Sequence, residues 1–387
     1  MKQVSILLAL GFGIALTGCA AKHEQKLMVP VKPIPPVALV EHYQIPDVAQ
    51  LFSLLPEQKA QFHHYFYAEQ HQHIAAHERL YNYLLKFTAG FDYQGKNLTA
   101  SEALKLKQGN CITLAVLTKA LADSVGLKTS FQQVVSAPVF GIEGNWFISS
   151  DHVRTFVYDD TLKKRATNVI TPASYIVVDY FPASGDIIGE RISSEHFYAM
   201  FYRNLGADAL LDEEYPLALA YLTKAVEIAP DYAAAINLVA LVHAKMQQDG
   251  LARLWYEYGL DIAGDTPVLL SNYAILQQRT GEHEAARRLQ DRLQQLSDPD
   301  PFALYQLARD AHRKQEYIKA VRLYQRLIDR APYVANFYFE MARSYYGMRQ
   351  FAFARDALQQ AAKLSKAGAE ETRYHAKLEA LQRNEAL

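Results

Sequence analysis

The sequence predicts an α+β domain followed by an all-α superhelix. Three strand-like segments follow a helical stretch between residues 111 and 181, and a 34-residue repeat of helical pattern begins near residue 198. At 387 residues, half of them hydrophobic, the chain is long enough for two or three domains. We divide it into a leader (1–18), an anchor and tether (19–40), an α+β domain (41–197), a repeat array (198–366) and a capping helix (367–387).

The charge balance excludes some classes of partner. Lys and Arg together number 40 and Asp and Glu 41, so the chain has no excess of either sign. A near-neutral chain lacks the basic surface that nucleic acid requires. We therefore predict no nucleic-acid partner, and we expect no cofactor.

The N-terminus is typical of a targeting segment. Lys2 precedes an apolar stretch from Val4 to Leu16, whose 13 residues are too few to favour a spanning helix. The sequence Leu16-Thr17-Gly18-Cys19-Ala20 resembles a bacterial lipobox. The resemblance implies cleavage before Cys19, diacylglycerol attachment to its thiol, acylation of the new amino terminus and thus a membrane anchor. The alternative is an ordinary signal peptide with an incidental cysteine.

The expected location follows from this anchor. Ala20, rather than Asp, follows the cysteine, which in lipoproteins of Gram-negative type is compatible with transfer to the outer membrane. The resemblance therefore implies a lipid-anchored protein of the cell envelope at the outer membrane, on the periplasmic face or the cell surface. Four prolines between residues 30 and 36 favour an extended, semi-rigid tether.

A long helix is predicted from Pro56 to Phe87. Its buried stripe is expected to hold Phe62, Phe66, His73, Leu80, Leu84 and Phe87. His73 and His77 are four residues apart, a spacing at which one helix can offer two imidazoles to a metal ion. No cysteine or carboxylate completes an obvious site, so we expect packed or solvated histidines and no metal.

Cys111 begins a second predicted helix. A polar turn, Gln108-Gly109-Asn110, leads directly into it, and its apolar pattern ends at Gly126. Thr99 or Ser101 caps a short helix before this turn. A thiol in the first turn of a helix lies at the positive end of the helix dipole, which favours the thiolate. The alternative for a lone cysteine is a buried structural residue.

Strands are predicted at 128–135, 151–158 and 175–181, with a loop at 138–150. His152 lies on the second strand and Asp179 on the third. Asp160, in the turn between these two strands, is an alternative to Asp179.

The run from Phe91 to Pro182 resembles the transglutaminase-like fold, a branch of the papain-like cysteine hydrolases. The resemblance is carried by an aromatic loop, a short helix, a Gly-x-Cys helix start, the exit from that helix, and His and Asp on successive strands: Tyr93, residues 100–104, Gly109-Asn110-Cys111, residues 122–128, His152 and Asp179. It implies a thiol hydrolase, protease or acyltransferase acting on peptide, isopeptide or amide bonds.

That chemistry gives each residue a role. The Cys111 thiolate attacks an acyl carbon, His152 holds and returns the proton, and Asp179 fixes the imidazole tautomer. The backbone amide of Cys111 is an expected oxyanion donor, and Gln108 or Asn110 adds a side-chain amide.

A repeat without gaps follows. Its first packing position recurs in five units as Tyr202, Ile236, Leu270, Leu304 and Tyr338. A small residue follows four positions later in each unit: Gly206, Ala240, Ala274, Ala308 and Ala342. A second small residue lies twelve positions further on: Ala218, Ala252, Ala286, Ala320 and Ala354. This pattern is similar to tetratricopeptide repeats, which stack antiparallel helix pairs. The alternative is an unrelated helical array. The resemblance implies a protein or peptide partner bound by the repeats.

Two classes of function remain. The first is a membrane-tethered cell-envelope thiol hydrolase or acyltransferase whose Cys-His-Asp triad acts while the repeats recruit a partner. The second is a non-catalytic scaffold lipoprotein that uses the repeats for protein–protein interaction. A third, in which the helical regions are a spacer, leaves Cys111 unexplained.

Overall fold

The computed structural model describes most of the chain after residue 42. The described residues are 34–36, 43–92, 96–135, 140–143, 146–149, 152–159, 174–180, 187–296, 301–330, 332 and 334–364. The chain divides into two units, Met1–Pro33 and Ile34–Leu387, and all described residues belong to the second. The predicted leader, Cys19, Tyr93, Asp160 and the capping helix 367–387 lie outside them. Among the described helices, none has the length and apolar character needed to cross a membrane.

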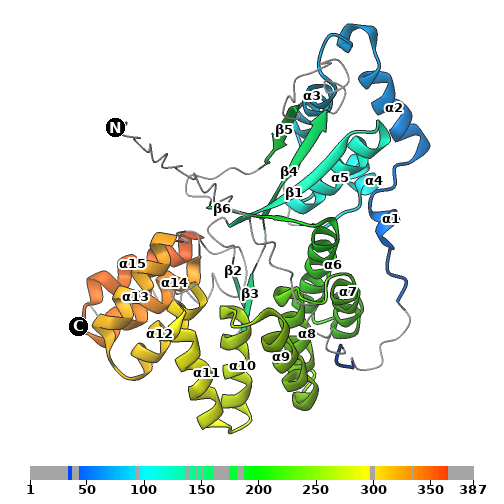
Figure 1. The fold of residues 1–387 in the computed structure, drawn as a ribbon. Coiled ribbons are helices and arrows are strands. Elements are labelled where there is room, and N and C mark those ends of the chain that lie inside the picture. The colour runs from blue at the N-terminus through cyan, green and yellow to red at the C-terminus, as the bar shows by residue number, and fades with distance from the viewer. Residues whose placement is uncertain are drawn as a thin grey trace, which may run out of the picture. The chain divides into compact units, whose positions relative to one another are not determined.

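A four-stranded antiparallel sheet stands beside the helices (Figure 1). Its order is β5-β4-β1-β6, and its strands are β1 (Lys128–Val135), β4 (His152–Asp159), β5 (Ser174–Val178) and β6 (Ile187–Ile192). The three predicted strands are present, while β6 was not predicted. Because β6 pairs with β1, it returns the chain to the far edge of the sheet before the first repeat helix begins.

The predicted loop 138–150 is wrong. It contains a two-stranded hairpin of β2 (Phe140–Glu143) and β3 (Trp146–Ser149). The register pairs Glu143 with Trp146, so two residues, Gly144 and Asn145, separate the strands. A Gly-Asn dipeptide between two apolar runs is a hairpin signal, and the predicted loop did not take it into account.

The predicted helix 56–87 is also wrong as one element. The chain here forms α1 (Val48–Leu51), α2 (Pro56–Phe66), a 3₁₀ turn (Glu69–His71) and α3 (Ala76–Thr88), followed by α4 (Ala100–Leu106) and α5 (Cys111–Ser124). Tertiary hydrogen bonds replace the helical ones at the break. Arg79 donates to the Phe66 carbonyl at 3.0 Å, and the Asp159 carboxylate accepts from the Ala76 amide at 3.1 Å.

This break separates the two histidines. His73 is exposed in the connection, whereas His77 is buried on α3. The His77 Nδ1 atom lies 3.6 Å from the Asp159 carboxylate, and its Nε2 lies 3.1 Å from the Ser174 hydroxyl. Within the described residues there is no group of three or more His, Cys, Asp or Glu side chains that could hold a metal ion. His77 therefore joins α3 to β4 and β5.

The chain continues as five helix pairs. They are α6 (Ser194–Leu211) with α7 (Tyr215–Ile228), α8 (Ala233–Lys245) with α9 (Asp249–Ala263), α10 (Pro267–Arg279) with α11 (His283–Gln295), α12 (Pro301–Arg313) with α13 (Tyr317–Arg330), and α14 (Ala335–Gly347) with α15 (Phe351–Leu364). Each turn within a pair contains one residue with positive φ, and these recur every 34 residues: Glu213, Gln247, Gly281, Gln315 and Arg349. A left-handed residue after a helix is a common helix terminator.

The small residues of the repeat lie at the helix crossings. All ten of the Gly and Ala signature positions are buried. A Cβ atom added to Gly206 would lie 2.5 Å from Leu222 Cγ, so α6 and α7 approach too closely for any side chain. The predicted repeat register is confirmed.

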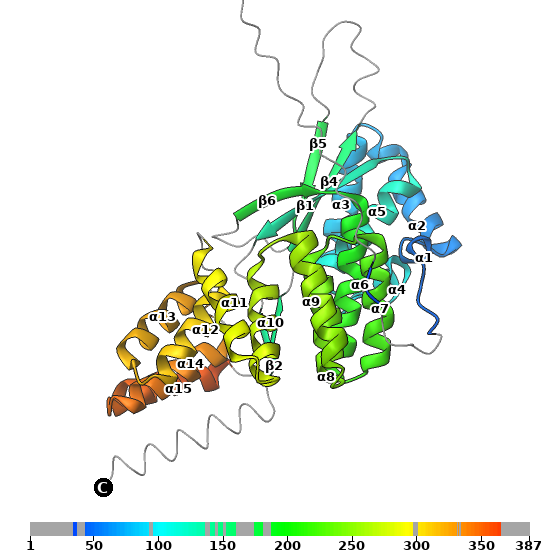
Figure 2. The same ribbon diagram turned by 60° about the horizontal axis from the view of Figure 1, so that its bottom comes forward.

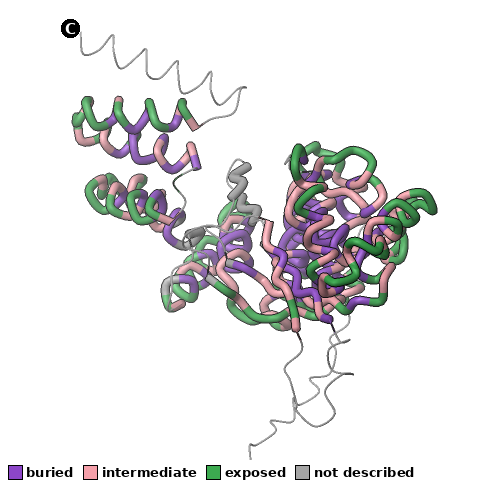
Figure 3. The backbone as a smooth tube through the Cα atoms, turned by 90° about the horizontal axis from the view of Figure 1, so that it is seen from above, coloured by how far each residue is buried: buried purple, intermediate pink, exposed green. Residues whose placement is uncertain are grey.

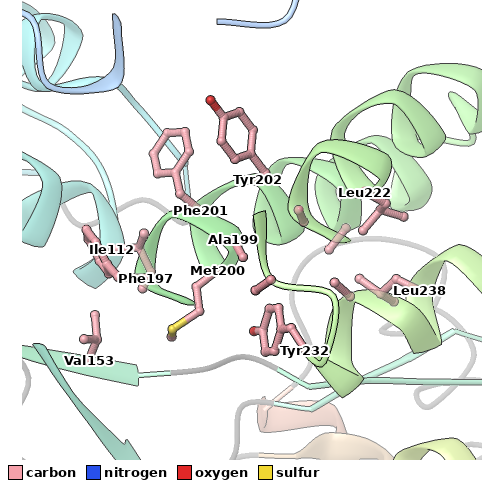
Figure 4. Close-up of a cluster of buried hydrophobic side chains, with 14 of the residues drawn as sticks. Ile112, Val153, Phe197, Ala199, Met200, Phe201, Tyr202, Leu222, Tyr232 and Leu238 are labelled. Carbon is pink, nitrogen blue, oxygen red and sulfur yellow. The ribbon is translucent and has the colours of Figure 1, made fainter. Parts of the chain in front are cut away.

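The sheet and the first repeats share one hydrophobic core. Phe131 of β1 stacks on Phe197 of α6 with ring centroids 3.8 Å apart. Figure 4 shows Phe197 beside Ile112 of α5, in the same buried cluster as Val153 of β4. This core continues from Leu51 to Leu293, and a second one covers Leu304 to Ala361. In Figure 3 the buried positions are purple, and they occur along the chain in both of these cores. The predicted boundary at 197/198 falls inside α6, which is at once a layer on the sheet and the first repeat helix.

The described part of the proline-rich tether lies on the repeats. The Trp255 indole N–H of α9 donates to the Pro36 carbonyl at 3.1 Å. Nearby along the chain, the Tyr202 hydroxyl of α6 donates to the Pro46 carbonyl at 2.7 Å. The extended, semi-rigid tether that the prolines predicted is therefore attached to α9 at Pro36.

Candidate functional site: the start of helix α5

Cys111 is the first residue of α5 and is half-buried. Asn110 is the N-cap: its side-chain oxygen accepts a hydrogen bond from the Thr113 amide at 2.9 Å. Ten of the next eleven residues, Ile112 to Ala122, are buried, so the helix passes through the core and only its ends approach the surface. The predicted helix start is confirmed.

Gly109 is required by the backbone before this helix. Its φ is +148°, a conformation that side chains disfavour, and a Cβ there would lie 2.5 Å from the Thr113 methyl group. The Gly109 amide donates to the Asp92 carbonyl at 3.1 Å, and the Asp92 amide donates to the Lys107 carbonyl at 2.8 Å. The turn before Cys111 is thus fixed against the segment at Asp92.

Asn97 links this helix start to the first repeat. Its side-chain oxygen accepts from the Asn110 amide group at 2.8 Å, and its nitrogen donates to the Asp208 carboxylate of α6 at 2.7 Å. Asn204 of α6 also donates to the Asn97 oxygen, at 3.4 Å. We call Asn97, Asn110, Asn204 and Asp208 the asparagine cluster.

Burial raises the pKa of the Asp208 carboxyl above its ordinary value of 3.8. The hydrogen bond from Asn97 acts in the opposite direction, the charge of Asp212 raises the pKa further, and the charge of Arg203 lowers it. Burial in the asparagine cluster therefore destabilises the charged form of the Asp208 carboxyl relative to the protonated form.

The predicted triad is placed only in part. His152 is the first residue of β4, opposite Val134 in the register, and its side chain lies outside the described part of the chain. Val153 and Val157 of the same strand belong to the core that α5 enters. The contact between His152 and Cys111 stays a prediction.

Asp179 directly follows β5 and is half-buried. The next residue, Tyr180, shares a 2.7 Å hydrogen bond between its hydroxyl and that of Thr118 on α5. Thr118 is seven residues after Cys111, about 10 Å along the helix axis. The segment after β5 is thus attached to the middle of α5, and the role of Asp179 stays a prediction.

The two oxyanion candidates differ. Gln108 is half-buried and bridges to Asp92 through its backbone. Both ends of the Asn110 amide group are engaged, by Thr113 and by Asn97. This geometry uses Asn110 to hold the helix start. The backbone amide of Cys111 is in the first turn of α5 and stays the predicted oxyanion donor.

Sequence reasoning missed the asparagine cluster. Neither Asn97 nor Asp208 was a predicted site residue, and 111 residues separate them in the sequence. An acidic residue between apolar neighbours, Ala207 and Ala209, was the available signal, since a partly buried carboxylate needs a partner.

The repeats offer a second candidate surface. The first helices of successive pairs contact one another, α6 with α8, α8 with α10 and α10 with α12. They therefore form a common layer. Beside α10, α11 and α12 lies a cavity of about 620 Å³ lined by residues of both charges: Gln278, His283, Ala286, Arg287, Gln290, Asp291, Asp310, Arg313 and Lys314.

Comparison with known proteins returns similar structures only. No family model matches the sequence, and no curated protein matches it. A structure of the Cut9–Hcn1 hetero-tetramer is 18% identical with a TM-score of 0.41; the match covers 49% of this chain and 37% of that one. Pseudomonas aeruginosa PilF is 19% identical with a TM-score of 0.39, covering 50% and 88%.

Yeast Tom70 is 15% identical with a TM-score of 0.42, covering 51% of this chain and 45% of its own. The chain thus spans about a third of the Cut9 relative and less than half of Tom70. The 34-residue period, the helix pairs and the buried small residues identify residues 194–364 as a tetratricopeptide-repeat region.

Proposed function

We propose that this chain is a scaffold whose tetratricopeptide repeats bind a protein partner. The observation that carries the proposal is the continuous layer of first helices from α6 to α12. Stacked helix pairs give an extended surface whose residues are supplied by several repeats, which suits a peptide or a protein segment better than a small molecule.

The test separates the repeats from the thiol. Ala320 is fully buried in α13, so Ala320→Glu places a charge between packed helices and costs several kcal/mol, on the order of 3–5. We expect the full chain and Cys111→Ala to capture the same partners from an envelope extract, and Ala320→Glu to lose them. Loss with Cys111→Ala and retention with Ala320→Glu would move recognition to the thiol.

A second function is supported by the start of α5. Cys111 is half-buried at the first turn of a buried helix, and the turn before it is fixed by Gly109 and Asn110. Together with the resemblance to transglutaminase-like proteins, this supports a thiol hydrolase or acyltransferase acting on peptide, isopeptide or amide bonds. His152 and Asp179 have the roles of proton carrier and orienting carboxylate in this proposal.

Its test is the chemistry of the thiol. With Cys19 changed to Ser, Cys111 is the only thiol, and we expect a peptide thioester or activated amide to acylate it. A covalent adduct on Cys111 that turns over with water or an amine supports the proposal. A folded protein that forms no adduct contradicts it and leaves the scaffold function alone.

The proposed location is the cell envelope, where acyl chains on Cys19 would anchor the chain to the outer membrane. The lipobox carries this proposal. Cys19→Ser should leave an unprocessed precursor that incorporates no labelled palmitate, while wild type is labelled. Equal label in both proteins would exclude Cys19 as the lipidation site.

A further inference from the structure

The β2–β3 hairpin lies on the repeats. β3 contacts both α8 and α10, the first helices of the second and third pairs. Figure 1 and Figure 2 both show the hairpin beside α10. In the sequence it connects β1 to β4 of the sheet, so a segment of the sheet region reaches across to the repeats.

The helices beneath it are covered on every side. In α8, Ala235 to Ala244 are buried without a gap, and in α10 the same holds for Leu269 to Ala274. A helix packed only among its repeat neighbours keeps one exposed face. A further layer therefore covers α8 and α10, and β3 is the described strand that contacts both.

One register position of the first helices changes in residue type along the repeats. Leu241 of α8 is buried, and Ile275, at the equivalent position of α10, is half-buried. The next two equivalent residues are arginines: Arg309 of α12 is half-buried and Arg343 of α14 is exposed. At this position the residue is therefore aliphatic in the two helices that β3 contacts and charged in the two that follow.

A side-chain hydrogen bond joins the two helices beneath the hairpin. Asn272 of α10 donates to Asn237 of α8 at 2.9 Å, so the two helices that β3 contacts are linked to each other.

We propose that the β2–β3 hairpin is an internal ligand of the repeats, and that a protein partner binds the same surface by displacing it. The surface of α8 and α10 takes an extended segment with aromatic and aliphatic residues, the composition of Trp146-Phe147-Ile148 in β3. Four residues of strand span about 13 Å, enough to cross two helices about 10 Å apart.

The partner in this inference rests on the proposed scaffold function, but the resting position of the hairpin does not. The first experiment tests that position in the full chain. A photo-reactive residue replaces Phe147 in one protein and Ile148 in a second, because neighbouring strand residues face opposite sides. We expect one of the two to cross-link to a peptide from α8 or α10. Cross-links only to other elements, or none from either position, would overturn the inference.

The second experiment tests displacement. Residues 140–149 are replaced by a Gly-Ser segment of equal length, and a labelled synthetic peptide of residues 140–149 is titrated against this variant and the wild-type chain. We expect the variant to bind the peptide at least tenfold more tightly, because its surface is vacant. Equal affinity for both proteins, with the variant folded by its cooperative thermal transition, would overturn the proposal.

A failure of the hairpin proposal and a failure of the scaffold function give different results in these experiments. If the scaffold function is wrong but the hairpin proposal is right, the cross-link and the affinity difference both appear while no protein is captured. If the variant does not fold, the cross-linking result in the full chain decides the position of the hairpin.

Discussion

The Asn97 side-chain nitrogen donates a hydrogen bond to the Asp208 carboxylate across 2.7 Å. The first residue belongs to the segment before α4, and the second to the first repeat helix, α6. Since the other end of Asn97 accepts from Asn110, the N-cap of α5, one side chain joins the thiol helix to the repeats. The sheet region and the repeats are therefore coupled by polar contacts as well as by the Phe131–Phe197 stack.

The asparagine cluster predicts a pH dependence. The pKa of Asp208 is raised, chiefly by burial, so folding favours its protonated form. The contribution of this group to stability is fully present below its unfolded pKa and is lost as the pH rises through the folded value. We expect Asp208→Asn to have a higher urea midpoint than wild type at pH 8, with the difference shrinking toward pH 3. Asp356→Asn, at an exposed position of α15, is the control; an equal gain from it at pH 8 would contradict the account.

Two glycines of the repeats should respond oppositely to alanine. A Cβ at Gly206 meets Leu222 at 2.5 Å, so Gly206→Ala forces α6 and α7 apart and should cost about 1–3 kcal/mol. Gly250, in α9, has nothing within 4 Å of the added atom, and Gly250→Ala should be neutral or stabilising by up to about 1 kcal/mol. Urea unfolding measures both; equal effects would exclude this close crossing.

The left-handed turn residues predict a stabilising change. Gln315 has a φ of 62° at the position that glycine holds in the third pair, Gly281 with a φ of 86°. A non-glycine residue there is strained by about 1 kcal/mol. Gln315→Gly should therefore raise the free energy of unfolding by up to about 1 kcal/mol, and Gly281→Ala should lower it by a similar amount. A loss of stability in Gln315→Gly would show that its side chain contributes more than the strain.

The thiol prediction concerns the geometry before Cys111. In a chain with Cys19→Ser, the rate of iodoacetamide alkylation at pH 7 should exceed that of a model cysteine peptide by tenfold or more. Gly109→Ala should reduce this rate because the new Cβ displaces Thr113. His152→Asn should reduce it as well if imidazole assists the thiolate. A wild-type rate equal to that of the peptide would mean that Cys111 is a packing residue.

The repeats were the most predictable part of the fold. Their signature residues recur at fixed spacing, and each small residue is required by a helix crossing, as Gly206 shows. The start of α5 was predictable for a similar local reason, since Asn110 and Gly109 act within three residues of Cys111. Signals that act over a few residues, or repeat, are visible in one sequence.

Features fixed by distant contacts were not predictable. The break between α2 and α3 depends on Asp159, 83 residues after the amide that it accepts from. The bond from Asn97 to Asp208 spans 111 residues. The β2–β3 hairpin had a local turn signal, but its contact with α8 and α10 did not follow from any pattern within it.

The most direct test of the scaffold function asks which face of the repeats a partner touches. Arg343 of α14 is in repeat register with Leu241 of α8, and α14 is attached to α12 by the hydrogen bond from Asn336 to Tyr305. Arg326 of α13 is exposed on a second helix. A photo-reactive residue is placed at each position in the full chain, and cross-linked proteins are identified after irradiation in cells. We predict a specific protein adduct at 343, retained in Cys111→Ala, and none at 326. Equal adducts at both positions, or none at 343, would contradict the account.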